Sequence, residues 1–204
     1  MKLTLALALL FAATSLSAQK SPEASTQQAF HSGGDIRMHL EAGGYTIRPS
    51  DSSNIVVTCS SESPEALRRV KTKVTVGASN ADVYVRNTPD HNFTAVIEVP
   101  RQSNLWVRLT AGQLDVEAIE GNKDLEIRAG QLNVDVAHPE EYGHRDASVW
   151  SGDIEASAFT VSKGGLFRSF EQDGQGKYRL HARVLAGEIE LRNLAGKSNQ
   201  PPGL

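Results

Sequence analysis

The chain has 204 residues, a formal net charge of −3 and a single cysteine. This length suits one domain with a real core, and a mildly acidic charge gives no electrostatic reason to bind nucleic acid. The lone Cys59 excludes an internal disulfide. Cys59 lies in the strand-like run 54–59, so we expect its side chain to be buried as a small hydrophobic residue. An intermolecular disulfide or a reactive thiol is the less favoured alternative.

The first 18 residues have the three parts of a secretory signal peptide. Lys2 supplies the charge, an apolar run follows from Leu3 to Ala13, and small residues end at Ala18. The run is too short for a permanent transmembrane helix, which needs about 20 apolar residues. We therefore expect removal after Ala18, with Ser17 as the alternative, and an exported protein in the periplasm or outside the cell. No cysteine stands directly after the run, so a lipid anchor is not expected, and no later stretch is long enough to span a membrane.

Both ends of the remaining chain are polar. Residues 19–32 and 194–204 offer little to bury, which predicts a disordered linker and a disordered tail around a single domain over residues 33–193. Within that domain apolar and polar residues alternate in short pieces, as in half-buried β-strands. Helical signal is confined to 63–70, where Pro64 stands near the start of one plausible turn. The pattern predicts an all-β protein.

One ten-residue pattern recurs five times in the domain. It reads apolar-x-apolar-x-small-Gly-x-apolar-x-apolar, and the small residue is always Ala or Ser. The apolar positions are odd before the glycine and even after it, so the inward phase flips there, which a flat strand cannot do. The chain must turn or bulge at each glycine, the residue that tolerates the required backbone angles. The repeat glycines are Gly43, Gly112, Gly130, Gly152 and Gly187.

Two architectures satisfy this pattern. In a β-solenoid each small-Gly pair forms a corner with its small residue pointing inward, and successive rungs stack. In a β-sandwich each pair forms a two-residue hairpin loop, although such loops favour Asn-Gly or Asp-Gly. Spacings of 18 and 22 residues between Gly112, Gly130 and Gly152 suit one rung each, and the longer gap that follows holds an excursion over 163–177. We favour the solenoid and keep the sandwich as the alternative.

The Ala-Gly-x-Leu-x-Val repeats, together with two longer stretches at 164–170 and 177–182, carry a family resemblance. The stretches read Gly-Gly-Leu-Phe-Arg-Ser-Phe and Lys-Tyr-Arg-Leu-His-Ala. Over roughly residues 33–193 the chain resembles bacterial exported proteins of the putative adhesin type, a domain of unknown function (DUF4097-like). The resemblance implies a right-handed β-helix-like fold and an envelope or secreted location. The family has no established catalytic residues that the resemblance could assign to positions of this chain.

Outward positions after the repeat glycines are rich in acids and amides. Stacked rungs would place their carboxylates about 5 Å apart, close enough for weak Ca²⁺ binding or acid–base pairing. A solvated face that keeps the sheet soluble is the simpler interpretation. The candidates are Asp115, Asp135, Glu155 and Glu190.

Trp106 and Trp150 also fall on outward phases of the repeat. Exposed aromatic faces on a β-surface would form a platform for stacking sugars or another contact surface. The alternative, which we favour, is that each ring is covered by a terminal segment or by the excursion over 164–178. We expect Phe167 and Phe170 to plug an open end of the solenoid.

The remaining candidate chemistry is weak. The loop from His138 to His144 holds two imidazoles and two carboxylates, but its spacing matches no strong zinc signature, so an ordinary loop is expected and no metal or cofactor. No nucleophile elbow or phosphate-binding glycine loop occurs. We therefore expect a non-catalytic envelope or cell-surface interaction module whose partner is unknown, with an envelope polysaccharide or another envelope protein as candidates. The alternative is a polysaccharide-binding or polysaccharide-processing β-helix, which rests on fold analogy.

Overall fold

The computed structural model describes residues 23–194. The predicted signal peptide and residues 195–204 of the predicted tail lie outside the described residues. Within them no helix is both long and apolar enough to cross a membrane.

The described chain is all-β, as the sequence predicts, and its twelve strands belong to one mixed sheet. Helical structure is limited to α1 (Pro64–Arg69) and the short 3-10 turns η1 (Pro139–Glu141) and η2 (Ser157–Phe159). The Ser63 hydroxyl caps α1 by accepting a hydrogen bond from Ala66 N at 3.2 Å, so the helical prediction is confirmed. The strands are β1 (Glu23–Ala29), β2 (Asp35–Leu40), β3 (Gly43–Ser50), β4 (Asn54–Ser61), β5 (Lys71–Val76), β6 (Asn80–Arg86), β7 (Phe93–Pro100), β8 (Asn104–Val116), β9 (Lys123–Val136), β10 (Tyr142–Ala156), β11 (Val161–Asp173) and β12 (Tyr178–Asn193).

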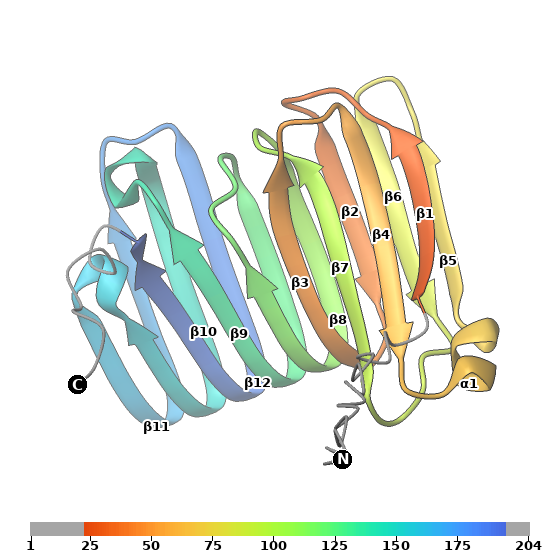
Figure 1. Cartoon of the computed structure of the whole chain (residues 1–204). Helices are drawn as coiled ribbons and strands as arrows, with labels where there is room; N and C mark the ends of the chain where they lie inside the picture. The colour runs from red at the N-terminus through yellow and green to blue at the C-terminus, as the bar shows by residue number, and fades with distance from the viewer. Residues whose placement is uncertain (1–22, 195–204) are drawn as a thin grey trace, which may run out of the picture.

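The sheet folds over into two facing layers (Figure 1), because its long strands bend at their repeat glycines and continue. Strand β8 runs unbroken through Gly112, so the two-residue hairpin proposed for the small-Gly pairs is wrong. In β8 Leu109 is buried before the glycine and Leu114 after it, which confirms the predicted flip of the inward phase. The buried side chains of both layers meet in one core.

The bends stack in a line. Strands β3, β8, β9, β12 and β10 pair in parallel and in register, which sets Gly43 beside Gly112, then Gly130, Gly187 and Gly152. All five have positive φ, and a Cβ built on Gly130 would lie 1.8 Å from the carbonyl oxygen of Gly112. At Gly112, Gly130, Gly187 and Gly152 any side chain would meet the backbone of the neighbouring glycine, and at Gly43 it would meet the Phe93 ring, so the stacked bends require glycine.

One expectation about the order of the rungs is wrong. Strand β12 lies between β9 and β10, so Gly130 neighbours Gly187 and not Gly152. The excursion over 163–177 consists mostly of β11, which pairs antiparallel with β10 along its length. The last part of the chain therefore folds back between strands that are closer in sequence.

Two further expectations need correction. The small residues before the repeat glycines do not point inward, since Ala129 and Ala186 are exposed and Ala111 is half-buried. The predicted linker 19–32 is not disordered from Glu23 onward: β1 pairs with β4 and Phe30 is buried. The pairing satisfies the backbone of a segment whose side chains add little to the core.

Cys59 is buried in β4, as predicted. Its thiol lies 3.5 Å from the Thr72 hydroxyl, and burial raises the pKa of the thiol. A raised pKa leaves little thiolate, the reactive form.

Lys123, by contrast, is a buried charge that the sequence analysis did not single out. It continues the inward phase of β9 and is 2% exposed. Its ammonium donates to the carbonyl oxygens of Ile119 at 2.5 Å and Gly121 at 3.3 Å, and to the Tyr142 hydroxyl. Burial lowers the pKa of Lys123 to about 7, because the charged form loses its hydration.

Substituting Gly130 by Ala tests the stacked bends. We expect the free energy of unfolding to fall by about 3 kcal/mol or more, since positive-φ strain alone costs 1–3 kcal/mol and the Cβ also meets backbone. Urea denaturation followed by circular dichroism measures the change. Gly33→Ala is the matched control, because Gly33 has φ +83° but no atom within 4 Å of its built Cβ. Equal losses in the two variants would contradict a role for the stacking.

The buried amine of Lys123 predicts a pH dependence. Its pKa is about 7 in the folded protein and 10.5 without burial, so the unfolded chain binds more protons between these values and stability rises with pH across that window. The slope is up to about 1.4 kcal/mol per pH unit. Lys123→Met should lose this rise in urea titrations between about pH 7 and pH 9.5, whereas exposed Lys73→Met should keep it. An unchanged slope in Lys123→Met would contradict the lowered pKa.

Candidate binding surface

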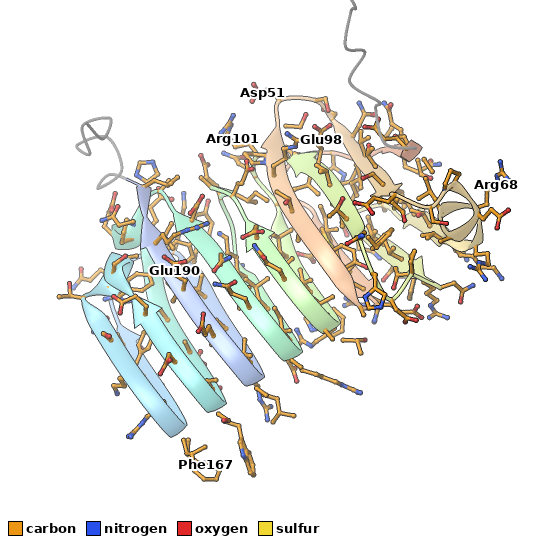
Figure 2. All side chains as sticks on the ribbon, turned by 60° about the horizontal axis from the view of Figure 1, so that its bottom comes forward. Asp51, Arg68, Glu98, Arg101, Phe167 and Glu190 are labelled. Carbon is orange, nitrogen blue, oxygen red and sulfur yellow. The ribbon has the colours of Figure 1, made fainter. Side chains whose placement is uncertain are left out.

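The bend edge carries an exposed aromatic pair. Trp150 of β10 is 56% exposed and Phe167 of β11 is 66% exposed, and their ring centroids are 4.6 Å apart. Leu166 and Leu185 are exposed beside them. Figure 2 shows Phe167 projecting beyond the bend, away from the ribbon. We call these four residues the aromatic corner.

The backbone of β11 presents Phe167 to Trp150. Val149 pairs with Arg168 and Ser151 with Leu166, so Phe167 falls opposite Trp150 on the neighbouring strand. Phe167 has φ +54°, a left-handed conformation that is unusual for a bulky residue. Residues in such conformations cluster at ligand-binding sites, where the surrounding structure holds them.

The aromatic corner changes two expectations. Trp150 points outward as predicted, but β11 does not cover it: Phe167 contacts the ring and leaves more than half of the side chain in water. The expected plug is right for Phe170, which is buried with its ring centroid 6.4 Å from that of Phe159. It is wrong for Phe167, because the bend turns that side chain out of the core.

Trp106 belongs to a different surface. Its ring lies under the Arg108 guanidinium, with 4.0 Å from the guanidinium carbon to the ring centroid. The Trp106 ring also contacts His39, with 5.1 Å between the ring centroids, and His39 stacks on Tyr84. Strands β9 and β12 separate Trp106 on β8 from Trp150 on β10, so the two tryptophans do not form one platform. Trp106 is covered in part, but by its own strand and its neighbours and not by a terminal segment.

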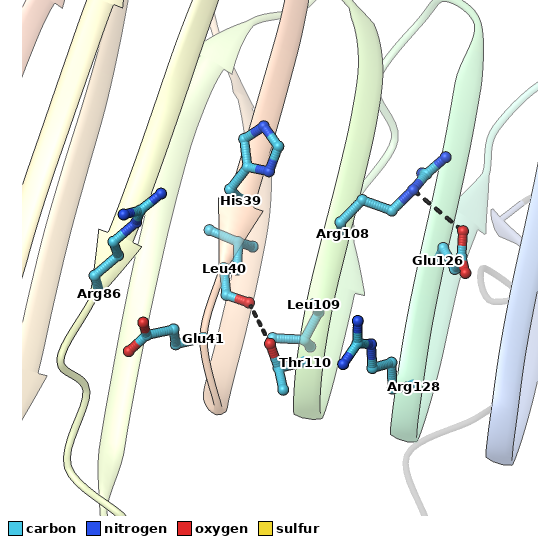
Figure 3. Close-up of a pocket in the computed structure, with 9 residues that line it drawn as sticks. All are labelled: His39, Leu40, Glu41, Arg86, Arg108, Leu109, Thr110, Glu126 and Arg128. Carbon is cyan, nitrogen blue, oxygen red and sulfur yellow. Dashed lines mark hydrogen bonds and ion pairs between the residues drawn. The ribbon is translucent and has the colours of Figure 1, made fainter.

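A hollow of about 300 Å³ lies on the same outer face, between β6 and β9 (Figure 3). Its lining includes Arg86, Arg108 and Arg128, together with Glu41 and Glu126. The Arg108 Nε lies 3.2 Å from a Glu126 carboxylate oxygen, and Glu41 accepts a hydrogen bond from Asn87 N at 2.6 Å. Both carboxylates are therefore already engaged.

The predicted acidic ladder forms only in part on the other layer. Asp115 accepts a hydrogen bond from the Asn133 amide at 2.7 Å, and Asp135 pairs with Arg192 at 2.7 Å. Arg192 also lies 3.8 Å from Glu190, which is in register with Glu155 on β10. Amides and an arginine interrupt the carboxylates, so the face resembles a solvated sheet more than a cation site. Within residues 23–194 no group of three or more His, Cys, Asp or Glu could hold a metal ion.

The histidines of the 138–144 loop do not converge. His138 lies 3.3 Å from Glu140, whereas His144 lies 2.8 Å from Asp173 of β11. The hydrogen bond to the Asp173 carboxylate raises the pKa of His144.

The sequence analysis missed Leu185 and assigned Phe167 to the core. A signal for Leu185 was present, since it stands two residues before its repeat glycine, as Trp150 does, and that position points outward in every repeat. Arg128 holds the same position in the repeat of Gly130. No comparable signal existed for Phe167, because its orientation depends on the left-handed backbone of β11.

The fold has counterparts among solved structures. It is similar to a putative cell adhesion protein from Clostridium sporogenes, with a TM-score of 0.55 and 10% identity, over 83% of this chain and 98% of that one. A putative adhesin from Parabacteroides distasonis matches with a TM-score of 0.26 and 14% identity, over 57% and 54% of the two chains. Another from Bacteroides fragilis matches with a TM-score of 0.25 and 8% identity, over 84% and 98%. No protein-family model and no curated protein matches the chain. The first similarity concerns the fold alone.

A pair of substitutions in β11 separates the exposed phenylalanine from the buried one. Phe167→Asn should change the free energy of unfolding by less than about 1 kcal/mol, because Asn tolerates the left-handed backbone and little buried area is lost. Phe170→Ala should cost about 3 kcal/mol or more, as for a core phenylalanine. Urea denaturation of both variants checks this. A loss in Phe167→Asn as large as in Phe170→Ala would mean that Phe167 is a structural plug.

Proposed function

We propose that the chain is a non-catalytic, exported interaction module of the cell envelope or surface, adhesin-like, and that the aromatic corner is its contact surface. The observation that carries the proposal is the exposed Trp150 and Phe167 pair at the bend edge. An envelope polysaccharide and an envelope protein are both partners of suitable chemistry.

Two physical arguments support this use of the aromatic corner. Contiguous exposed apolar side chains are uncommon on soluble proteins, and they mark contact sites more often than chance. Phe167 is also held in a backbone conformation that costs free energy, and a purely structural residue at that position would be replaced by Gly or Asn without penalty. A contact surface explains both features.

The same proposal includes a more detailed description of the fold and of the cellular location. Parallel, in-register pairing of β8, β9, β12 and β10 supports a right-handed β-solenoid of short rungs, whereas the antiparallel β11 and β4 support the sandwich alternative. The adhesin-type names of the solved structures agree with the family resemblance of the sequence. The apolar segment near Met1 supports export.

A polysaccharide-processing protein is the second candidate. The hollow in Figure 3 supports it, because Glu41 and Glu126 lie there among three arginines. Against it, Arg108 forms an ion pair with Glu126, and the backbone N–H of Asn87 donates a hydrogen bond to Glu41. Neither carboxylate is placed as an unengaged acid or base.

Binding of the purified protein to isolated envelope fragments and to an array of envelope polysaccharides tests the contact surface. Trp150→Ala should lower the apparent affinity about tenfold or more, since buried aromatic anchors dominate such contacts. Trp106→Ala is the matched control and should change the affinity less than twofold, because Arg108 and His39 already occupy that ring.

Full retention of binding by Trp150→Ala would overturn the aromatic corner as the contact surface. Release of shorter glycans from the array, lost in Glu41→Gln, would favour the processing alternative. Circular dichroism confirms that each variant is folded.

A further inference from the structure

The aromatic corner is one end of a longer row of side chains. Arg128 of β9, Leu185 of β12, Trp150 of β10 and Phe167 of β11 stand at one level on four neighbouring strands, since the residues flanking each of them pair in register. With strands about 4.8 Å apart, the row spans about 14 Å. It runs across the strands, along the edge where the sheet bends.

Cationic side chains accompany the row on its outer face. Arg183 stands two residues before Leu185 and lines a hollow of about 250 Å³ together with Trp150 and Phe167. Arg128 lines the neighbouring hollow of Figure 3, where its side chain extends toward Thr110. The two hollows therefore adjoin the two ends of one row.

These arginines lack internal partners. The side chains of Arg128 and Arg183 have no hydrogen bond or ion pair to any other described residue, although Glu126 stands in register with Arg183. Glu126 is held by Arg108 at 3.2 Å, and Arg108 also binds Asp124 at 2.8 Å. Two unpaired guanidinium groups beside an aromatic pair are notable in a chain whose net charge is −3.

We propose that this row binds an acidic polysaccharide, with sugar rings stacked on Trp150 and Phe167 and sugar carboxylates bound by Arg128 and Arg183. The inference rests on the proposed function and specifies its ligand. Guanidinium groups bind carboxylates through two parallel hydrogen bonds, which gives both charge and geometric selectivity. Flat aromatic faces with an adjacent cation suit a ligand that has apolar ring faces and charged substituents.

The shape of the site favours a polysaccharide over a protein partner. A stable protein interface buries about 800 Å² on each side, and the apolar part of this surface is limited to the four side chains of the aromatic corner, three of which belong to the row. An extended chain of sugars can follow such a row across the strands. The shallow hollows beside it have room for substituents of the rings.

The test compares acidic polysaccharides with their own methyl esters, which keep the ring faces and lose the charge. Polygalacturonate, alginate and hyaluronate serve as probes, and titration calorimetry with the purified protein measures affinity at low and high salt. We expect at least one acid to bind about tenfold more tightly than its ester, with the difference shrinking at high salt as charge pairs are screened.

Three variants assign the effect. Arg128→Gln with Arg183→Gln should abolish the preference for acid over ester while leaving binding to the ester within about twofold. Trp150→Ala should weaken binding to acid and ester alike. Arg179→Gln is the matched control, an exposed arginine on β12 four residues before Arg183 and away from the bend, and should keep the preference.

Several results would overturn the inference. The first is that no acidic polysaccharide binds more tightly than its own methyl ester. The second is that the preference for acid over ester survives in the double arginine variant. The third is that arginine-dependent binding to phosphatidylglycerol vesicles is tighter than binding to any polysaccharide, which would indicate a lipid surface as the ligand. Failure of the proposed function looks different, because envelope binding would then persist in Trp150→Ala whatever the arginine variants do.

Discussion

The close approach of backbone to backbone along the stacked glycines fixes the geometry of the parallel strands β3, β8, β9, β12 and β10. A Cβ on Gly112, Gly130, Gly187 or Gly152 would lie 1.7 to 2.0 Å from a carbonyl oxygen of the adjacent glycine. Strands can pack this closely through a bend only if their glycines are level. A shift of one residue in any strand would press a side chain into backbone and would also turn that strand's apolar residues out of the core. The glycines thus set the register of these parallel strands, and the register places their outward side chains.

This constraint explains how residues far apart in the chain come to form one surface. Arg128, Trp150 and Leu185 belong to three repeats and share one place in the repeat, two residues before the glycine. Level glycines make that shared place a row in space. The repeat is uniform at the buried positions because the core demands it, whereas the outward positions are free to vary. Function, on this view, resides in the variation of one repeat position from strand to strand.

The sequence was informative wherever a local pattern determines the outcome. The phase flip at Gly112, the burial of Cys59, the outward direction of Trp150 and the short helix after Ser63 all follow from nearby residues. The order of β9, β12 and β10 does not, because the repeats present nearly identical edges and any of them can pair. The pairing of β1 with β4 could not be predicted either, because it depends on backbone hydrogen bonds and the polar side chains of β1 give no strand pattern. Lys123 shows a third limit, since its partners lie in the turn before β9 and at the start of β10.

Strand β11, at one edge of the sheet, shows how an exposed aromatic surface is compatible with an open sheet edge. A bare edge invites pairing with another chain, and natural sheets oppose it with charged side chains. In β11 the Lys163 ammonium donates to the Ser169 carbonyl oxygen at 2.7 Å, and the Arg168 Nε donates to that of Gly164 at 2.6 Å. These cations occupy backbone acceptors of the strand that bears Leu166 and Phe167. Nonspecific strand pairing is thereby disfavoured while the aromatic rings remain open, so contact is directed to the face of the corner and away from the edge of the sheet.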